Sequence, residues 1–243
     1  MNSLNLTPKT DRIPYFNVNE IFGRTIQGEG PHTGQNVSFL RLSGCNLSCV
    51  WCDTPYSWDW ERYDRNEESH KHSVSDVAEA LTNLGANRVV ITGGEPMIQQ
   101  RHFPLLHQLT GMKIDVETNG TKMPTDEVIE AVDLFCVSPK LAHAGDSAEM
   151  RIKPEVLQKF SELAKQGKAF FKFVVESEDD FSEVEHFLEI GEIPDSAVWI
   201  MPEGTTYETH MSKLLALTDS IVERGWNVSS RLHVLIWGTE RGH

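Results

Sequence analysis

The stretch VSFLRLSGCNLSCVWCDT, residues 37–54, decides the fold because it joins a short strand to a loop that carries three cysteines. Its first six residues are mostly apolar and aromatic, which predicts a strand. Cys45, Cys49 and Cys52 follow, with three residues in the first gap and two in the second. The loops after the strands build the functional site in α/β proteins, so we expect the chemistry of this chain at its strand ends.

The same strand signal recurs along the chain, and stretches with helical periodicity separate the repeats. The predicted strands are residues 37–42, 89–92, 113–117, 134–138, 170–175 and 198–201, and the predicted helices are residues 75–84, 99–109, 126–132, 154–165, 178–190 and 210–224. This alternation predicts parallel βαβ units wound in one sense. We therefore expect an α/β fold, a partial, laterally open parallel βα barrel of about six units. A doubly wound sheet is the alternative, and residues 232–237 could add a strand or an edge piece.

The chain shows no linker or low-complexity tract that would mark an internal boundary, and 243 residues suit one α/β domain. We expect a single domain over residues 1–243. It contains a cysteine loop at residues 43–54 and an insertion at about residues 53–72, which is rich in Trp, Asp, Glu and His.

The charge balance argues against two classes of partner. The chain has 22 Lys and Arg against 36 Asp and Glu, a formal net charge of −14. This charge repels a phosphate backbone and anionic lipid headgroups, so we expect neither nucleic acid nor a membrane as partner. The first residues, MNSLNLTPKTDRIPYF, lack the basic region and the apolar run of a secretory signal, so we expect a cytoplasmic protein.

Glycine and polar residues follow several of the predicted strands. These segments are TGGEP at 92–96, ETNG at 117–120, SPK at 138–140 and MPEG at 201–204. Because the carboxyl ends of parallel strands meet at one edge of the sheet, we expect these segments to surround the cysteine loop.

The cysteine loop predicts an iron–sulfur cluster. Three thiolates in one short loop can surround a single soft metal centre, and a cluster with three protein ligands leaves one iron open. A structural zinc site would need a fourth ligand from elsewhere, and three unconnected thiols are the other alternative. Cys136, in the strand LFCVS, is interpreted as a buried small apolar residue.

A CxxxCxxC loop followed by a strand ending in GGEP resembles the radical S-adenosylmethionine superfamily. The resemblance implies a 4Fe-4S cluster on Cys45, Cys49 and Cys52, and S-adenosylmethionine bound at its open iron. Reduction of the cluster then cleaves the cofactor to a 5′-deoxyadenosyl radical, which removes a hydrogen atom from the substrate. The protein contributes positioning and exclusion of side reactions.

The segment EIFGRTIQGEGP at 20–31, the CDT at 52–54 and the strand-end motifs resemble the 7-carboxy-7-deazaguanine synthases. The resemblance implies ring contraction of 6-carboxy-5,6,7,8-tetrahydropterin to 7-carboxy-7-deazaguanine with release of ammonia, on the route to queuosine. It also implies an electron donor protein such as a flavodoxin, and a homodimer. A glycyl-radical-activating enzyme and a non-catalytic metal-binding module are the alternatives.

The resemblance also implies roles for individual residues, none of them catalytic beyond the cluster. The substrate residues are Gln27, Gly28, Glu29, Arg41 and Thr92, the Mg²⁺ ligand is Thr54, and the cofactor residues are Gly93, Gly94, Glu117, Ser138, Pro139 and Lys140. Glutamate and backbone groups suit the amide and amino edge of a pterin, and the planar fork of arginine suits its carboxylate. Strand alternation places Arg41 on the face of Val37 and Phe39, toward the barrel lumen.

Overall fold

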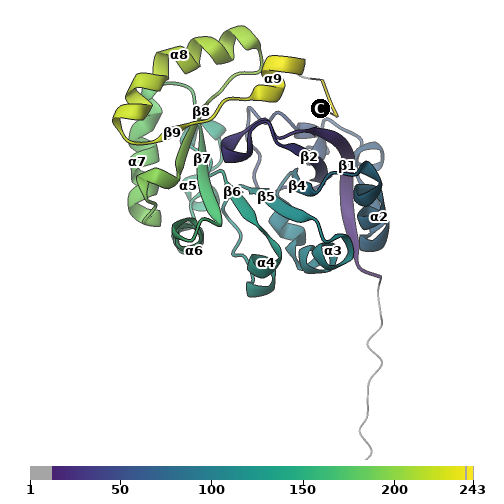
Figure 1. Cartoon of the computed structure of the whole chain (residues 1–243). Helices are drawn as coiled ribbons and strands as arrows, with labels where there is room; N and C mark the ends of the chain where they lie inside the picture. The colour runs from purple at the N-terminus through teal and green to yellow at the C-terminus, as the bar shows by residue number, and fades with distance from the viewer. Residues whose placement is uncertain (1–12, 239, 243) are drawn as a thin grey trace, which may run out of the picture.

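The computed structural model describes residues 13–238 and 240–242, and the strands in these ranges form one mixed sheet (Figure 1). The strand order is β3-β1-β2-β4-β5-β6-β7-β8-β9. The strands are β1 (Tyr15–Ile26), β2 (Asn36–Leu42), β3 (His70–Ser73), β4 (Arg88–Gly93), β5 (Lys113–Thr118), β6 (Leu134–Val137), β7 (Ala169–Val175), β8 (Val198–Pro202) and β9 (Asn227–Val228).

From β2 to β9 every neighbouring pair is parallel, whereas β1 pairs antiparallel with both β2 and β3. The six predicted strands are confirmed as β2, β4, β5, β6, β7 and β8. Their spatial order follows their sequence order, as in barrel winding, whereas a doubly wound sheet would reverse direction at a switch point. β3 and β9 are the two edges, so the sheet is open, as predicted.

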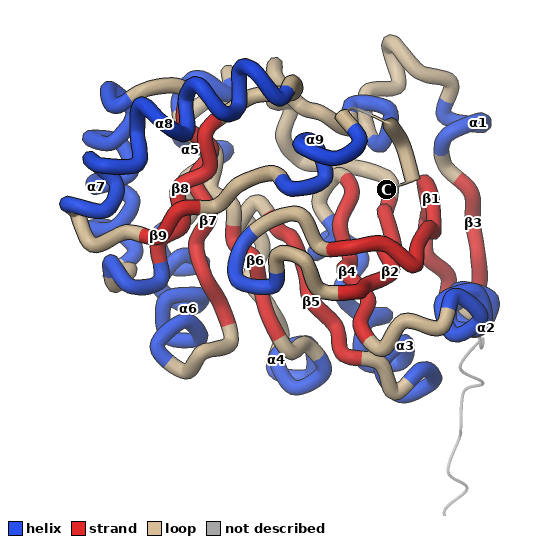
Figure 2. Tube along the Cα trace, turned by 45° about the horizontal axis from the view of Figure 1, so that its top comes forward, coloured by secondary structure: helices blue, strands red, loops and turns tan. Residues whose placement is uncertain are grey.

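The helices lie mainly along the outer side of the curved sheet (Figure 2). They are α1 (Arg65–Glu68), α2 (Val74–Leu84), α3 (Phe103–Thr110), α4 (Asp126–Ala131), α5 (Ala148–Arg151), α6 (Pro154–Lys165), α7 (Phe181–Gly191), α8 (Tyr207–Glu223) and α9 (Leu232–Trp237). None of the described helices is long and apolar enough to span a bilayer.

Side-chain alternation along the strands separates the core from the barrel lumen. On β4, Val89 and Ile91 join the main apolar core with the helices, whereas Val90 packs with Val37 and Phe39 in a separate small cluster. The main core contains fully buried phenylalanines, including Phe171 and Phe173 of β7. The opposite face of the same strands is therefore free to carry polar side chains into the lumen.

The structure corrects the prediction in three places. β1 was not predicted as a strand, because its residues are mostly half-buried and mix polar with apolar side chains. Residues 232–237, predicted as a strand or edge piece, form α9, in which only Val234 is buried. The helix predicted at 99–109 is divided into a 3₁₀ turn, Pro96–His102, and α3, which carries a proline in its first turn.

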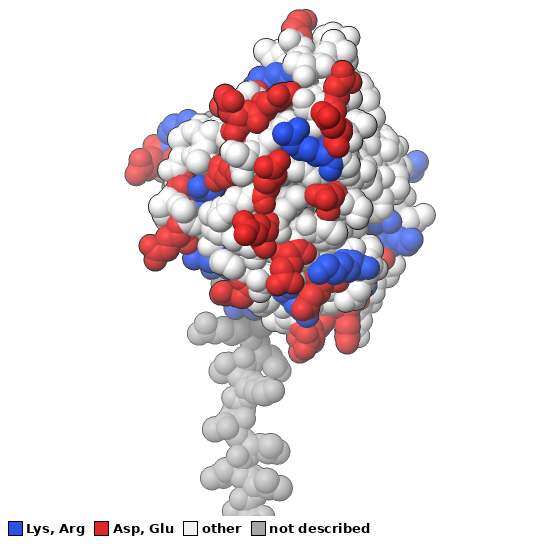
Figure 3. Space-filling view, turned by 90° about the vertical axis from the view of Figure 1, so that its left-hand side faces the viewer, with Lys and Arg blue, Asp and Glu red and all other residues white. Residues whose placement is uncertain are grey.

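The predicted insertion at about 53–72 contains α1 and ends in β3, which pairs with β1 and extends the sheet. Acidic side chains outnumber basic ones on the face shown in Figure 3, consistent with the formal net charge of −14.

Candidate active site

A cavity of about 240 Å³ lies at the carboxyl ends of the parallel strands, and nearly every predicted site residue lines it. The predicted residues on its wall are Gln27, Gly28, Glu29, Arg41, Cys45, Cys49, Cys52, Thr54, Thr92, Gly93, Gly94, Glu117, Ser138 and Lys140. Pro139 is the exception, so the structure gives it no place on this wall. Segments separated by more than 100 positions thus meet in one site.

The cysteine loop is fixed to the end of β4 by backbone hydrogen bonds. Gly94 N donates to Leu42 O at 3.0 Å, and Glu95 N donates to Gly44 O at 2.8 Å. A Cβ atom on Gly94 would lie 2.1 Å from Gly44 O, and one on Gly93 would lie 2.1 Å from Leu42 O. Only glycine permits so close an approach, which explains the paired glycines of the GGEP motif.

Glu95 holds the ends of β4 and β5 together. Its carboxylate is 1% exposed and accepts hydrogen bonds from Met97 N at 2.9 Å, Thr118 Oγ1 at 2.7 Å and Asn119 N at 2.6 Å. Asn119 continues the connection, because its Nδ2 donates to Asn46 Oδ1 in the cysteine loop at 3.1 Å. Glu95 therefore shapes the turn that supports this loop.

The three thiols of the cysteine loop are unpaired and lie in largely apolar surroundings. Burial raises the pKa of Cys45 to about 12 and that of Cys49 to about 11, so these thiols are protonated in the metal-free chain. Trp58 Nε1 donates to Cys52 Sγ at 3.2 Å. A soft metal centre would bind here by displacing the protons.

The donor set fits a cluster better than a single ion. The described residues contain no group of three His, Cys, Asp or Glu side chains that could hold one metal ion. A zinc site needs its ligands gathered around one ion, whereas a 4Fe-4S cluster takes each thiolate on a different iron. Cys136 is buried, as predicted, and borders a separate, smaller cavity beside the main one.

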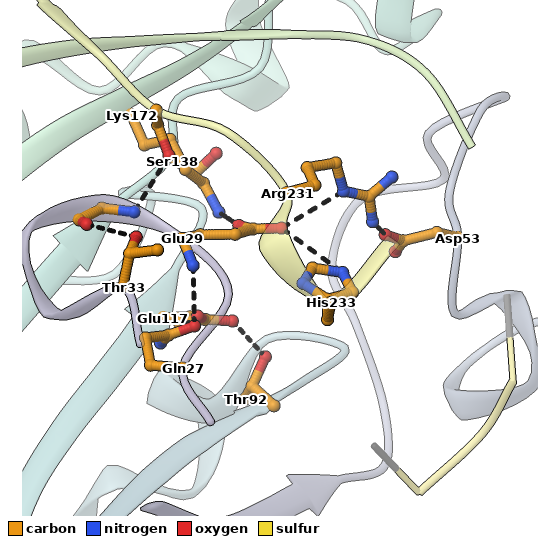
Figure 4. Close-up of polar contacts among 12 residues, drawn as sticks. Gln27, Glu29, Thr33, Asp53, Thr92, Glu117, Ser138, Lys172, Arg231 and His233 are labelled. Atoms are coloured by element: carbon orange, nitrogen blue, oxygen red, sulfur yellow. Dashed lines mark hydrogen bonds and ion pairs between the residues drawn. The ribbon is translucent and has the colours of Figure 1, made fainter. Parts of the chain in front are cut away.

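Glu29 is the most strongly paired carboxylate of the site (Figure 4). Lys172 Nζ contacts its Oε2, Arg231 Nε lies 3.3 Å from its Oε1, and His233 Nε2 lies 3.9 Å from the same oxygen. Burial opposes ionisation, but Lys172 and Arg231 hold the pKa of Glu29 well below its usual range. The carboxylate is therefore negative at every physiological pH.

A second set of contacts connects the predicted residues Gln27, Thr92 and Glu117 (Figure 4). Gln27 Nε2 donates to Glu117 Oε1 at 3.2 Å, and Thr92 Oγ1 donates to Glu117 Oε2 at 2.8 Å. Gln27 Oε1 accepts from Glu29 N at 3.2 Å. These bonds fix the orientation of the Gln27 amide and of the Glu117 carboxylate.

Arg41 lines the cavity, which confirms its predicted orientation toward the lumen. Its Nε donates to Glu20 Oε1 at 2.6 Å, and its guanidinium lies 5.6 Å from the centre of the Phe22 ring and 6.0 Å from that of Tyr56. The ion pair and the rings restrain the side chain while it remains on the cavity wall.

Lys140, one of the residues predicted to bind the cofactor, contacts Ser138 and Trp51. Its Nζ donates to Ser138 O and Ser138 Oγ, both at 3.0 Å, and lies 5.6 Å from the centre of the Trp51 ring. Thr54 lies on the opposite side of the cysteine loop, with its Oγ1 3.7 Å from Cys52 Sγ. A hydroxyl, an ammonium and the thiols therefore border one space.

Several polar residues of the site were not predicted from the sequence, among them four that form ion pairs with Glu29 or with one another. Asp53, Lys172, Arg231 and His233 all line the cavity. Lys172 carried a readable signal, since it is a charged residue in the otherwise apolar strand AFFKFVV. The others carried none, because they lie in a loop or in the segment around α9.

The comparisons with known proteins agree with this geometry. Residues 40–140 match the model of the Radical SAM superfamily, which defines the chain as a radical S-adenosylmethionine protein with a 4Fe-4S cluster and S-adenosylmethionine as its cofactors. The chain is 40% identical to the 7-carboxy-7-deazaguanine synthase of Pyrobaculum aerophilum, over 94% of this chain and 98% of the relative. It is 32% identical to that of Rhodopirellula baltica, over 89% of this chain and 84% of the relative.

The chain therefore belongs to the 7-carboxy-7-deazaguanine synthase family. It is an enzyme, and its reaction is the radical ring contraction in queuosine biosynthesis that the resemblance implied. The crystal structure of QueE from Escherichia coli has the same fold, with a TM-score of 0.67 and 24% identity over 90% of this chain and 95% of that one. This family replaces the two alternatives, a glycyl-radical-activating enzyme and a non-catalytic metal-binding module.

Proposed function

We propose that the cavity binds 6-carboxy-5,6,7,8-tetrahydropterin between Glu29 and Arg41. The carboxylate of Glu29 has lone pairs left to accept N–H groups from the amino and amide edge of the pterin. The guanidinium of Arg41 suits the substrate carboxylate. The observation that carries the proposal is the ionised Glu29, held between Lys172 and Arg231 at the base of the site. Gln27 and Gly28 directly precede Glu29, and Thr92 on β4 is the register partner of Arg41 on β2, so these three residues complete the substrate side.

We propose that the opposite side of the cavity holds the cofactors. When bound, the cluster and S-adenosylmethionine supply the radical that removes a hydrogen atom from the substrate. Gly93 and Gly94 admit the cofactor closely to the backbone. Lys140 and Ser138 offer donors to carboxylate and hydroxyl groups, and Glu117 accepts from hydroxyls. We assign Thr54 as the one protein ligand of Mg²⁺, which keeps most of its waters.

The finer cellular assignments are also proposals. A flavodoxin-type protein as electron donor and a homodimer follow from the family alone, whereas one working domain over residues 1–243 rests on the chain length and on the absence of a linker in the sequence. A cytoplasmic location is supported by the unpaired cysteines, since a reducing compartment preserves thiols for a cluster.

Anaerobic reconstitution tests the proposed substrate. The protein is loaded with iron and sulfide, then incubated with the carboxypterin, S-adenosylmethionine, Mg²⁺ and a reductant, and the products are identified by mass spectrometry. We expect 7-carboxy-7-deazaguanine and ammonia. Cofactor cleavage without consumption of the carboxypterin would contradict the proposed substrate.

Arg41→Ala tests the substrate orientation. We expect at least tenfold weaker binding of the carboxypterin, about the loss of one charge-assisted hydrogen bond, while uncoupled cofactor cleavage continues. An unchanged dissociation constant would remove Arg41 from the substrate site. Arg62→Ala is a matched control, because Arg62 is exposed and pairs only with Asp59 three positions away.

A further inference from the structure

Arg231 contacts three segments of the chain that are distant from one another in sequence, and Figure 4 shows two of these contacts, those with Glu29 and Asp53. Its Nε donates to Glu29 Oε1 at 3.3 Å, its Nη2 donates to Asp53 Oδ2, and its Nη1 donates to Gly204 O at 3.1 Å. The side chain is 10% exposed. Every nitrogen of the guanidinium therefore has a different partner.

The two carboxylates on Arg231 belong to different parts of the site. Glu29 lies in the segment proposed to bind the pterin, whereas Asp53 lies in the cysteine loop, between Cys52 and Thr54. The guanidinium is planar and rigid, so the position of one acceptor restrains that of the other. A lysine at this position would present one compact charge without that fixed fork.

The backbone at Arg231 is itself fixed to the substrate segment. Leu232 N donates to Gly28 O at 2.9 Å, and Arg231 N donates to the buried His210 Nε2 at 3.2 Å. Two positions before Arg231, Ser229 Oγ accepts a hydrogen bond from Gly30 N at 2.9 Å. Movement of residues 28–30 would therefore be passed to Arg231 through its main chain as well as through Glu29.

We infer that Arg231 is a positioning residue that couples occupation of the substrate site to the order of the cysteine loop. A pterin held by Glu29 restrains the guanidinium, and the guanidinium restrains Asp53 and with it the cysteine and threonine on either side. Coupling between two ligand sites is reciprocal, so bound substrate should tighten binding of S-adenosylmethionine by the factor by which the cofactor tightens binding of substrate. The inference rests on the proposed role of Glu29.

The first test uses the metal-free protein and needs no turnover. Amide hydrogen exchange of residues 43–54 is measured by mass spectrometry with and without saturating carboxypterin. We expect the pterin to slow exchange at least fivefold in the wild type, and Arg231→Lys to abolish this effect while still binding the pterin. Asp53→Asn removes the other end of the link and should have the same effect. It keeps the test valid if the arginine variant does not fold.

The second test uses the cluster-loaded protein. The dissociation constant of S-adenosylmethionine is measured with and without the carboxypterin, and we expect a decrease of about fivefold or more in the wild type. Arg231→Lys and Asp53→Asn should each remove the decrease. The double variant should bind S-adenosylmethionine no more weakly than either single variant, because both substitutions break the same link. Arg224→Lys is the matched control, since Arg224 is exposed, lies outside the cavity and pairs with Glu185.

The outcomes separate this inference from the proposed function. If the wild type binds and converts the carboxypterin but Arg231→Lys keeps full coupling, the inference is wrong and the function stands. If both variants lose pterin affinity while the loop still responds to saturating pterin, Arg231 is a substrate-site residue only. If the wild type does not bind the carboxypterin, both proposals are overturned.

Discussion

Replacing Lys172 with methionine removes the ammonium group that contacts Glu29 and keeps an unbranched apolar side chain on β7. Both side chains are buried, with 8% of Lys172 and 11% of Glu29 exposed. After the substitution Glu29 keeps Arg231 at 3.3 Å and His233 at 3.9 Å, both on Oε1. Its Oε2 loses the contact with Nζ.

The expected loss lies between two limits. A hydrogen bond to a charged group contributes about 1.5–3 kcal/mol, and a buried ion left without any partner costs about 3–5 kcal/mol. Because Arg231 still compensates the carboxylate, we expect the lower range, about 2–3 kcal/mol of unfolding free energy at pH 7. Lys213→Met is the control. The Lys213–Glu203 pair has both side chains 30% exposed and should contribute about 1 kcal/mol or less.

The loss of unfolding free energy should depend on pH, and the direction of this dependence follows from the pKa of Glu29. The pKa of Glu29 is depressed in the folded protein, so its pairing stabilises the fold above the usual carboxyl value of 4.5 and is lost as pH falls through the folded value. Without Lys172 the folded pKa rises, so the penalty of the substitution should stay constant from pH 7 to about pH 5 and shrink as pH falls below the usual carboxyl value of 4.5. Urea unfolding of the metal-free protein across this range measures it. A penalty below about 0.5 kcal/mol at pH 7, the size of an ordinary surface substitution, would refute the reasoning, as would a penalty independent of pH.

Six further substitutions test the cysteine loop and its support. Replacing any one of its three cysteines with alanine should abolish the cluster absorption, whereas Cys136→Ala should leave it intact; bleaching by the latter alone would contradict the ligand assignment. Gly94→Ala places a Cβ 2.1 Å from Gly44 O, so iron content after reconstitution should fall severalfold. Glu95→Gln replaces one acceptor oxygen with a donor facing a backbone N–H, and urea unfolding should show a loss of about 1–3 kcal/mol.

The parallel half of the fold could be predicted because its strands are buried on both faces. β7, for example, is buried at every position, and such a strand reads as a continuous apolar run. β1 could not, because its register against β2 is broken twice and most of its residues are only half-buried. Alternating hydrophobicity, the sequence signal of a half-buried strand, is lost where bulges shift the register.

The functional site follows the same pattern, because some of its residues could be predicted from the sequence and others could not. The residues identified from the sequence lie in local motifs at strand ends. The alternation that placed Arg41 in the lumen also places Lys172 there when applied to β7, on the face opposite to the core residues Phe171 and Phe173. Arg231 had no such signal, since its partners Glu29 and Asp53 lie 202 and 178 positions away.

The ionisation of Glu29 therefore depends on two cations from the other half of the chain. In the sequence this residue is a loop carboxylate, whose likeness to a substrate ligand rests on the motif around it. In the structure, Lys172 from the wall of the barrel and Arg231 from the segment before α9 determine its charge and orientation. Substitutions at these two distant positions should change substrate binding even when the QGEG segment at 27–30 is intact.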